Sequence, residues 1–140
     1  MNCKSLFIAA MFMCSCLLAI SQDLTNEAKI VEIYGQDFVD SRRLVQPVML
    51  VLMDKYISHG FIVQEDTEGK FHALEPLEMI PLRTEQMDSI SVEQFIEEYN
   101  STDFNPLRYL FFTKVEGQVY RLKGSNKMIC ILPQEAILLK

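Results

Sequence analysis

The longest apolar stretch after residue 21 runs from Pro47 to Val63, and its pattern predicts a buried helix that leads into a strand. Apolar residues recur at helical spacing, with further apolar residues beside them: Val48, Val51, Leu52 and Tyr56, then Met49, Leu50, Met53 and Ile57. Pro47 suits the first helical position because proline has no N–H to lose, and Gly60 suits a left-handed residue that ends the last turn. A helix that is apolar over most of its circumference is expected to be buried, and residues 61–63 favour a core strand.

A first helix is predicted over residues 24–42, with Thr25 as an acceptable N-cap and basic residues at its C-terminal end. Gly35 in the middle predicts a kink or a break, since glycine in a helix costs about 1 kcal/mol relative to alanine. One face is apolar, with three flanking residues: Leu24, Ala28, Val31, Phe38 and Val39, flanked by Ile30, Ile33 and Tyr34. With the Pro47 helix, this segment predicts an αα-hairpin.

Two short apolar runs after this hairpin predict strands. Residues 61–64 and 70–74 flank a polar turn that ends in Gly69, which predicts a β-hairpin. Prolines interrupt the chain beyond it, and proline rarely occupies a central strand. The segment around residues 77–82 is therefore interpreted as an extended edge or a loop.

The clearest short helix covers residues 91–100. Ser91 at the N-cap with Gln94 three residues later forms a capping box, and Asn100 is a plausible left-handed terminator. The helix has one apolar face: Val92, Phe95, Ile96 and Tyr99.

The last third of the chain predicts an antiparallel three-stranded meander over residues 107–115, 118–122 and 127–132, followed by a brief helix over residues 134–139. The third strand is apolar on both faces, so it is expected to be central or covered. Helices and antiparallel strands in separate blocks give an α+β fold. No repeat or linker interrupts residues 22–140, which predicts a single domain.

The first 21 residues have the pattern of an export signal. Lys4 precedes an apolar run, and Ala19 and Ser21 place small side chains before a cleavage point at Gln22. We therefore expect residues 1–21 to be a cleaved signal peptide and the mature protein to be secreted or periplasmic. An uncleaved signal anchor and a lipoprotein acylated at Cys16, or else at Cys14, remain alternatives.

The charge and the cysteine content of the chain argue against several classes of partner and against internal disulfide bonds. The chain has a formal charge of −6, and the expected signal removes one lysine and no acid, so the remainder is more negative still. That acidity argues against a nucleic acid or an anionic membrane surface as partner. Beyond the signal the only cysteine is Cys130, so no internal disulfide is expected. No membrane span is expected in the mature chain.

Candidate chemistry is scarce in the rest of the chain. His59, His72 and Cys130 have no recognised ligand spacing, and Cys130 lies in an apolar strand where its pKa is expected to be raised. Acidic residues crowd a turn at Glu65, Asp66 and Glu68 and cover one helix face at Glu93, Glu97 and Glu98, which is typical of solvated surface. We assign no catalytic, cofactor-binding or metal-ligating residue. Asn100-Ser101-Thr102 matches an N-glycosylation sequon, relevant only in a host that glycosylates.

Several segments together resemble small secreted proteins of Bacteroidota, especially flavobacterial ones, that have no established activity. The resemblance includes the signal end Ser21-Gln22, the Pro47 helix running into residues 60–63, and the stretch SVEQFIEEYNSTDFNPLRYLFF from Ser91. Tyr120-Arg121-Leu122 and Pro133-Gln134-Glu135 add to it. It implies the periplasm or exterior of a Gram-negative bacterium and carries over no catalytic residue.

Two functions follow as hypotheses. The first is a non-enzymatic exported module that binds another protein or an envelope component, for which a sheet edge near residues 76–82 or the C-terminal meander is available. The second is a small hydrolase or ligand carrier whose site is assembled in three dimensions around His59, His72, Asp66 and Glu68. The sequence favours a non-enzymatic protein without a cofactor and leaves catalysis open.

Overall fold

A computed structural model describes residues 23–86, 88–112 and 115–140, so the predicted signal peptide with Cys14 and Cys16 lies outside the described residues. The described chain mixes helices and strands, which confirms the α+β prediction. It forms two compact units with their boundary between Asp54 and Lys55. The prediction of one domain over residues 22–140 stays a prediction, and each unit is described by itself.

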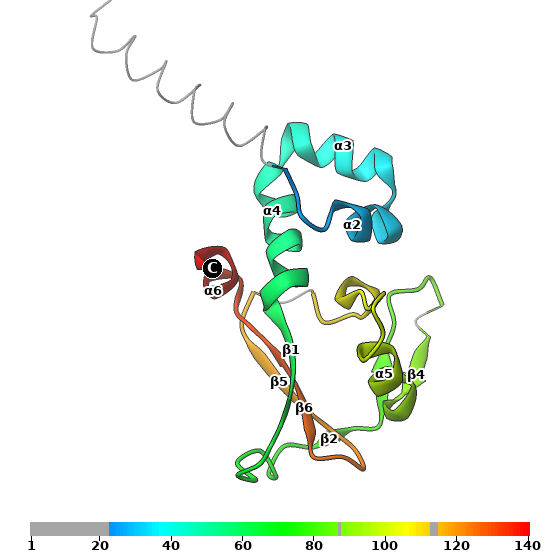
Figure 1. The fold of residues 1–140 in the computed structure, drawn as a ribbon, viewed down its shortest axis with the longest axis vertical. Coiled ribbons are helices and arrows are strands. Elements are labelled where there is room, and N and C mark those ends of the chain that lie inside the picture. The colour runs from blue at the N-terminus through cyan, green and yellow to red at the C-terminus, as the bar shows by residue number, and fades with distance from the viewer. Residues whose placement is uncertain (1–22, 87, 113–114) are drawn as a thin grey trace, which may run out of the picture. The chain divides into compact units, whose positions relative to one another are not determined.

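Three helices make up the described part of the first unit, residues 23–54, so the predicted αα-hairpin is wrong in detail. They are α2 (Glu27–Tyr34), α3 (Gln36–Val45) and α4 (Pro47–Lys55), the last of which ends at the boundary (Figure 1). The chain breaks at Gly35, whose φ of 84° is a conformation that residues with a side chain rarely adopt. The single long helix predicted over residues 24–42 is therefore two helices.

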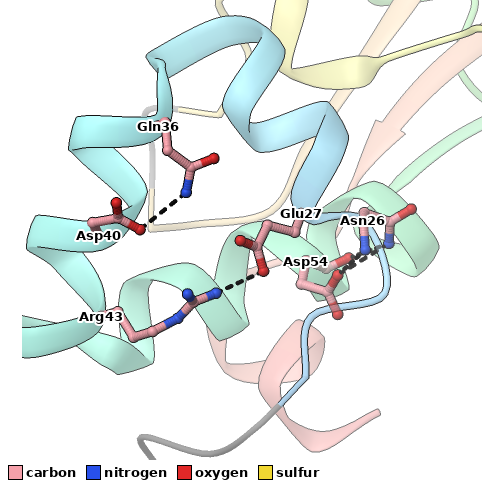
Figure 2. A network of polar contacts seen from close by, with 6 residues as sticks. All are labelled: Asn26, Glu27, Gln36, Asp40, Arg43 and Asp54. Carbon is pink, nitrogen blue, oxygen red and sulfur yellow. Dashed lines mark hydrogen bonds and ion pairs between the residues drawn. The ribbon is translucent and has the colours of Figure 1, made fainter.

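A polar network ties these three helices together (Figure 2). The backbone N–H of Asn26 donates to Asp54 Oδ1 over 2.6 Å, and its side-chain amide donates to the same carboxylate and to the Asp54 carbonyl. Arg43 forms an ion pair of 2.6 Å with Glu27. The residue that precedes α2 is thus Asn26 rather than the predicted Thr25, and it binds α4 instead of capping α2.

The apolar side chains of the first unit are divided between buried and exposed positions. The buried ones are Ile30, Val39, Leu50, Leu52 and Met53. Val48, predicted to be buried, is 62% exposed, because it lies in the first turn of α4 where α3 ends. Leu52 is buried as predicted, and so is Tyr56 at the start of the second unit.

The second unit begins with a π-helical turn, η1 (Tyr56–Gly60), that leads directly into strand β1 (Phe61–Glu65). The predicted passage from helix to strand is confirmed. Gly60 is not left-handed, which corrects the prediction. A Cβ at Gly60 would lie 2.7 Å from Ile137 Cδ1 and 2.9 Å from Tyr56 Cδ2. Glycine is required here by close packing rather than by its φ angle.

The main sheet has four strands in the order β1-β6-β5-β2. Its other strands are β6 (Lys127–Ile131), β5 (Gln118–Leu122) and β2 (Pro76–Leu77). β6 is central, as predicted, and β1 pairs with it in antiparallel register, Phe61 opposite Ile131. The predicted hairpin between residues 61–64 and 70–74 is therefore wrong. Residues 70–74 form turns, because the Asp66 carboxylate accepts hydrogen bonds from the backbone N–H groups of Lys70 and Phe71.

A second sheet and a helix follow. Strands β3 (Met79–Pro81) and β4 (Ser89–Ser91) pair antiparallel, and α5 (Val92–Tyr99) follows with the predicted capping box. Asn100 is not left-handed, with a φ of −80°, and instead donates its side-chain amide to the Ile96 carbonyl over 2.9 Å.

Residues 107–112 and 115, the described part of the predicted strand over residues 107–115, do not form a strand, so of the predicted three-stranded meander the structure shows the β5–β6 hairpin. A 3-10 turn, η2 (Pro106–Arg108), begins the segment, with the Asn105 side chain accepting from Leu107 N–H over 3.1 Å. Proline and this cap favour a turn over a strand. The closing helix α6 (Gln134–Leu139) is present as predicted.

An aromatic cluster forms the core of the second unit. The Phe61 ring lies 5.6–6.3 Å, centroid to centroid, from the rings of Phe95, Phe104, Tyr109 and Phe111. The Tyr109 hydroxyl donates to Glu98 Oε2 over 2.5 Å. Burial, and then Glu98, raise the pKa of Tyr109. The first residue of β1 thus meets α5 and the segment after η2 in one cluster.

Gly60→Ala is expected to lower the free energy of unfolding by about 1–3 kcal/mol, because the added methyl group overpacks a filled site. Ile137→Ala removes the side chain nearest to that methyl group, so the two substitutions together should destabilise by less than the sum of their separate effects. Urea unfolding of the two single variants and the double variant measures this coupling. Strict additivity would show that Gly60 and Ile137 do not pack as described.

Candidate functional site

One end of the four-stranded sheet gathers polar and charged groups from segments far apart in sequence. The Asp66 N–H donates to the Asn126 carbonyl over 2.7 Å, and the Lys123 N–H donates to the Leu77 carbonyl over 2.9 Å. We call residues 66–77 together with residues 121–127 the loop end of the sheet. It contains three of the residues that the sequence suggests for a ligand site: Asp66, Glu68 and His72.

His72 meets Arg121 at the loop end, with 3.3 Å between His72 Nδ1 and Arg121 Nη1. The contact depends on the parallel pairing of β2 with β5, which sets Pro76 opposite Arg121. Gly69, with a φ of 64°, lies against the imidazole, and a Cβ there would come within 2.7 Å of His72 Nε2. The structure therefore gives His72 a cationic neighbour that the sequence did not indicate.

An open hollow of about 490 Å³ lies beside this pair. It is lined by Pro76, Arg121, Leu122, Lys123, Gly124, Ser125 and Asn126. Within the described chain, Arg121 Nε is buried and has no hydrogen-bond partner. A guanidinium beside backbone and hydroxyl groups suits a carboxylate or a phosphate. Arg121 is the one guanidinium among the residues that line the hollow.

The acidic candidates at the loop end already have partners. Asp66 accepts from the backbone of its own loop, Glu68 pairs with Lys70, and Glu65 lies 3.7 Å from Lys127. Surface pairs of this kind contribute about 0–1 kcal/mol. These hydrogen bonds and ion pairs fix the conformation of an exposed loop, and they do not bring two carboxylates together as an acid/base pair.

His59 does not join His72. It is exposed and lies in η1, before the first residue of β1, whereas His72 follows the last. Five residues of strand separate the two ends by about 13 Å. Within residues 23–86, 88–112 and 115–140, no group of three His, Cys, Asp or Glu side chains is placed to hold a metal ion.

Cys130 lies on β6, opposite Ile62 on one side and Val119 on the other. Burial raises the pKa of this thiol, and the Gln64 amide, which donates to Sγ over 3.3 Å, partly offsets that rise. The raised pKa agrees with the expectation from its apolar strand. The described residues contain no second cysteine, so no disulfide forms among them.

The edge of β1 is the second feature of interest. Gly60 and Asp66, at either end of β1, both hydrogen-bond to the chain on the β6 side, through Leu132 N–H and the Asn126 carbonyl. Because hydrogen-bonded pairs alternate in an antiparallel ladder, the backbone groups of Phe61, Val63 and Glu65 point away from β6. No other strand of the described chain pairs with that side.

The opposite edge of the sheet differs. β2 has two residues, one of which is Pro76. Short strands and prolines protect sheet edges from further pairing, whereas β1 has no proline or lysine along its length. Residues 76–82 do form edge strands, as predicted, in β2 of this sheet and β3 of the second sheet, but both strands are short and contain proline. β1 is the longer edge of the main sheet and the one open to pairing along its length.

No helix in the described residue ranges is long and apolar enough to cross a bilayer. Comparisons with protein-family models, with curated proteins and with solved structures give no match to this chain.

Alkylation of Cys130 is expected to be slower than that of a cysteine model peptide at pH 8, since a raised pKa leaves less thiolate. Gln64→Leu removes the hydrogen bond that favours the thiolate and should shift the pH–rate curve to still higher pH. Iodoacetamide kinetics across pH 7 to 10, followed by mass spectrometry, measure both curves. A curve for the unmodified protein at or below that of the peptide would contradict the burial of this thiol.

Proposed function

We propose that this protein is an exported, non-enzymatic interaction module of the bacterial periplasm or envelope, and that it binds an extended segment of a partner protein along β1. The observation that carries the proposal is the unpaired edge of β1, where alternate backbone groups point away from β6. Strand addition at such an edge is a common mode of peptide recognition.

The side chains of β1 suit this mode. Ile62 and Val63 are half-buried, while Gln64 and Glu65 are exposed. An added strand would cover the apolar pair and leave the polar pair in water. The occupant is therefore an extended segment with apolar residues next to Ile62 and Val63 and polar residues beyond them. Backbone hydrogen bonds would supply affinity, and these two positions would supply selectivity.

Export is supported by the sequence. The apolar run from Leu6 to Ile20 ends in small residues at Ala19 and Ser21, which is the pattern of a signal peptide. The resemblance to small secreted proteins of Bacteroidota points in the same direction. A partner in this compartment is another envelope protein.

Val63→Pro tests the binding mode. It removes an outward N–H from β1 without removing a hydrogen bond to β6, because proline is tolerated where the N–H faces solvent. The matched control is Val63→Thr, which keeps the N–H and the branched side chain. Both tagged proteins are used to recover partners from an envelope extract, and affinities are then measured with the recovered partner.

The expected result is recovery by the unmodified protein and Val63→Thr, with about a tenfold or greater loss of affinity for Val63→Pro, since one backbone hydrogen bond and the close approach of the strand are lost. Circular dichroism establishes that the proline variant keeps its fold. Equal affinity of the two variants, or failure of the unmodified protein to recover any partner, would contradict the proposal.

A second candidate function, binding of a small anion, is favoured by the buried Arg121 Nε beside the hollow at the loop end. His72 lies next to the same guanidinium, which makes this the form of the ligand-carrier hypothesis that the structure supports best. His59 has no part in it.

Titration with inorganic phosphate, followed by amide NMR shifts, tests this candidate. Saturable shifts are expected at Ser125 and Asn126, and Arg121→Gln should abolish them because the guanidinium is lost. Lys140→Gln removes one positive charge elsewhere in the second unit and should leave them unchanged. Shifts that do not saturate, or that persist in Arg121→Gln, would remove anion binding at this hollow.

A further inference from the structure

The corner between α3 and α4 exposes a run of large apolar side chains. Two residues on each side of Gln46-Pro47 contribute to it: Leu44 is 78% exposed, Val45 71%, Val48 62% and Met49 38%. We call these four residues the apolar corner. Single exposed apolar residues are common on protein surfaces, but a contiguous group of them marks a surface that contacts a membrane or another molecule.

The corner is not a poorly packed part of the core. α4 also buries Leu50, Leu52 and Met53, so this helix is apolar on its buried side and on its exposed side. An amphipathic surface helix would carry polar residues on the exposed side. Figure 1 shows the end of α3 meeting the start of α4 at a bend of the first unit.

The corner has its own charge pattern within an acidic chain. No Asp or Glu occurs from Ser41 to Met53, and Arg42 and Arg43 directly precede the corner. The Arg42 guanidinium lies 5.2 Å from the centroid of the Phe38 ring and donates to Gln46. Arg43 is held by Glu27. Cationic groups at the base of exposed apolar side chains match the layering of a bilayer surface, with phosphates outside and acyl chains below.

The acidic groups nearest in sequence, Asp40 and Asp54, both accept hydrogen bonds from groups within the unit. Asp40 accepts a hydrogen bond from Gln36 over 2.9 Å, and Asp54 is bonded to Asn26, as Figure 2 shows. The same network joins α2, α3 and α4. The corner is therefore presented by a braced unit rather than by a loose loop, so little ordering is needed on docking.

We propose that the apolar corner inserts into the interfacial layer of a lipid bilayer, with Arg42 at the level of the phosphate groups. The occupant is a membrane rather than a protein groove because the exposed apolar residues lie in a segment without Asp or Glu, directly after Arg42, which suits acyl chains below a layer of phosphate groups. The insertion is independent of strand addition at β1.

A single introduced tryptophan tests the proposal, because the chain contains none. Val48→Trp places the probe in the corner, and Leu139→Trp is the control, at a residue 82% exposed in the second unit. Each full-length variant is mixed with zwitterionic vesicles of phosphatidylethanolamine and phosphatidylcholine, with or without brominated acyl chains, because the acidity of the chain disfavours an anionic surface. Both variants carry the same N-terminal apolar run of residues 6–20, so a difference between them reports insertion of the corner rather than attachment through that run.

The expected result is a blue shift and quenching of the Val48→Trp emission by brominated lipid, with neither change for Leu139→Trp. Leu44→Ser combined with Val48→Ser should weaken vesicle binding of protein that lacks the N-terminal run by about tenfold or more. No shift for Val48→Trp would overturn the proposal. A blue shift without vesicles that grows with protein concentration would also overturn it and assign the corner to contact between copies.

Discussion

Burial of the Phe61 ring is the constraint on which the second unit depends. Phe61 begins β1, yet its ring packs with aromatic side chains from α5 and from the segment after η2. One side chain thus joins the sheet to the non-sheet part of the unit. Aromatic pairs in this geometry add about 0.5–1.5 kcal/mol each beyond the burial of their surface. The position of β1 in the sheet is set by this contact and by pairing with β6.

Local patterns predicted the elements whose causes are local. The capping box at Ser91, the helix-to-strand passage near Gly60, the β5–β6 hairpin and the closing helix all depend on residues within a few positions of one another. The predicted partner of β1 is wrong because its actual partner, β6, begins more than 60 residues later in the chain, whereas the polar turn directly after β1 favours a local hairpin. Asp66 decides that turn by binding the backbone of residues 70 and 71, and nothing in the alternation of the sequence indicates this.

The candidate site was less predictable than the fold. His72 was identified as a suspect, but its neighbour Arg121 was not, because their contact depends on a two-residue parallel pairing that has no sequence signal. The sequence predicts an edge near residues 76–82, which β2 confirms, but it does not indicate that β1 is the other edge, since only the strand order shows this. Val48 differs in another way, because the sequence predicts that it is buried and the structure leaves it exposed. The apolar circumference of α4 predicts burial on several sides, but the structure leaves the first turn of this helix exposed where α3 ends.

The π-helical turn at η1 makes the length of one segment critical for the fold. Here the chain changes from helical to extended geometry over residues 56–60, and a shift of one position in a strand moves every side chain to the opposite face. A one-residue insertion or deletion between Tyr56 and Phe61 would turn Phe61 outward and Ile62 inward. Length variation among homologues should therefore be absent from this segment and concentrated in the loop after Asp66, where an added residue does not move any strand side chain to the opposite face of the sheet.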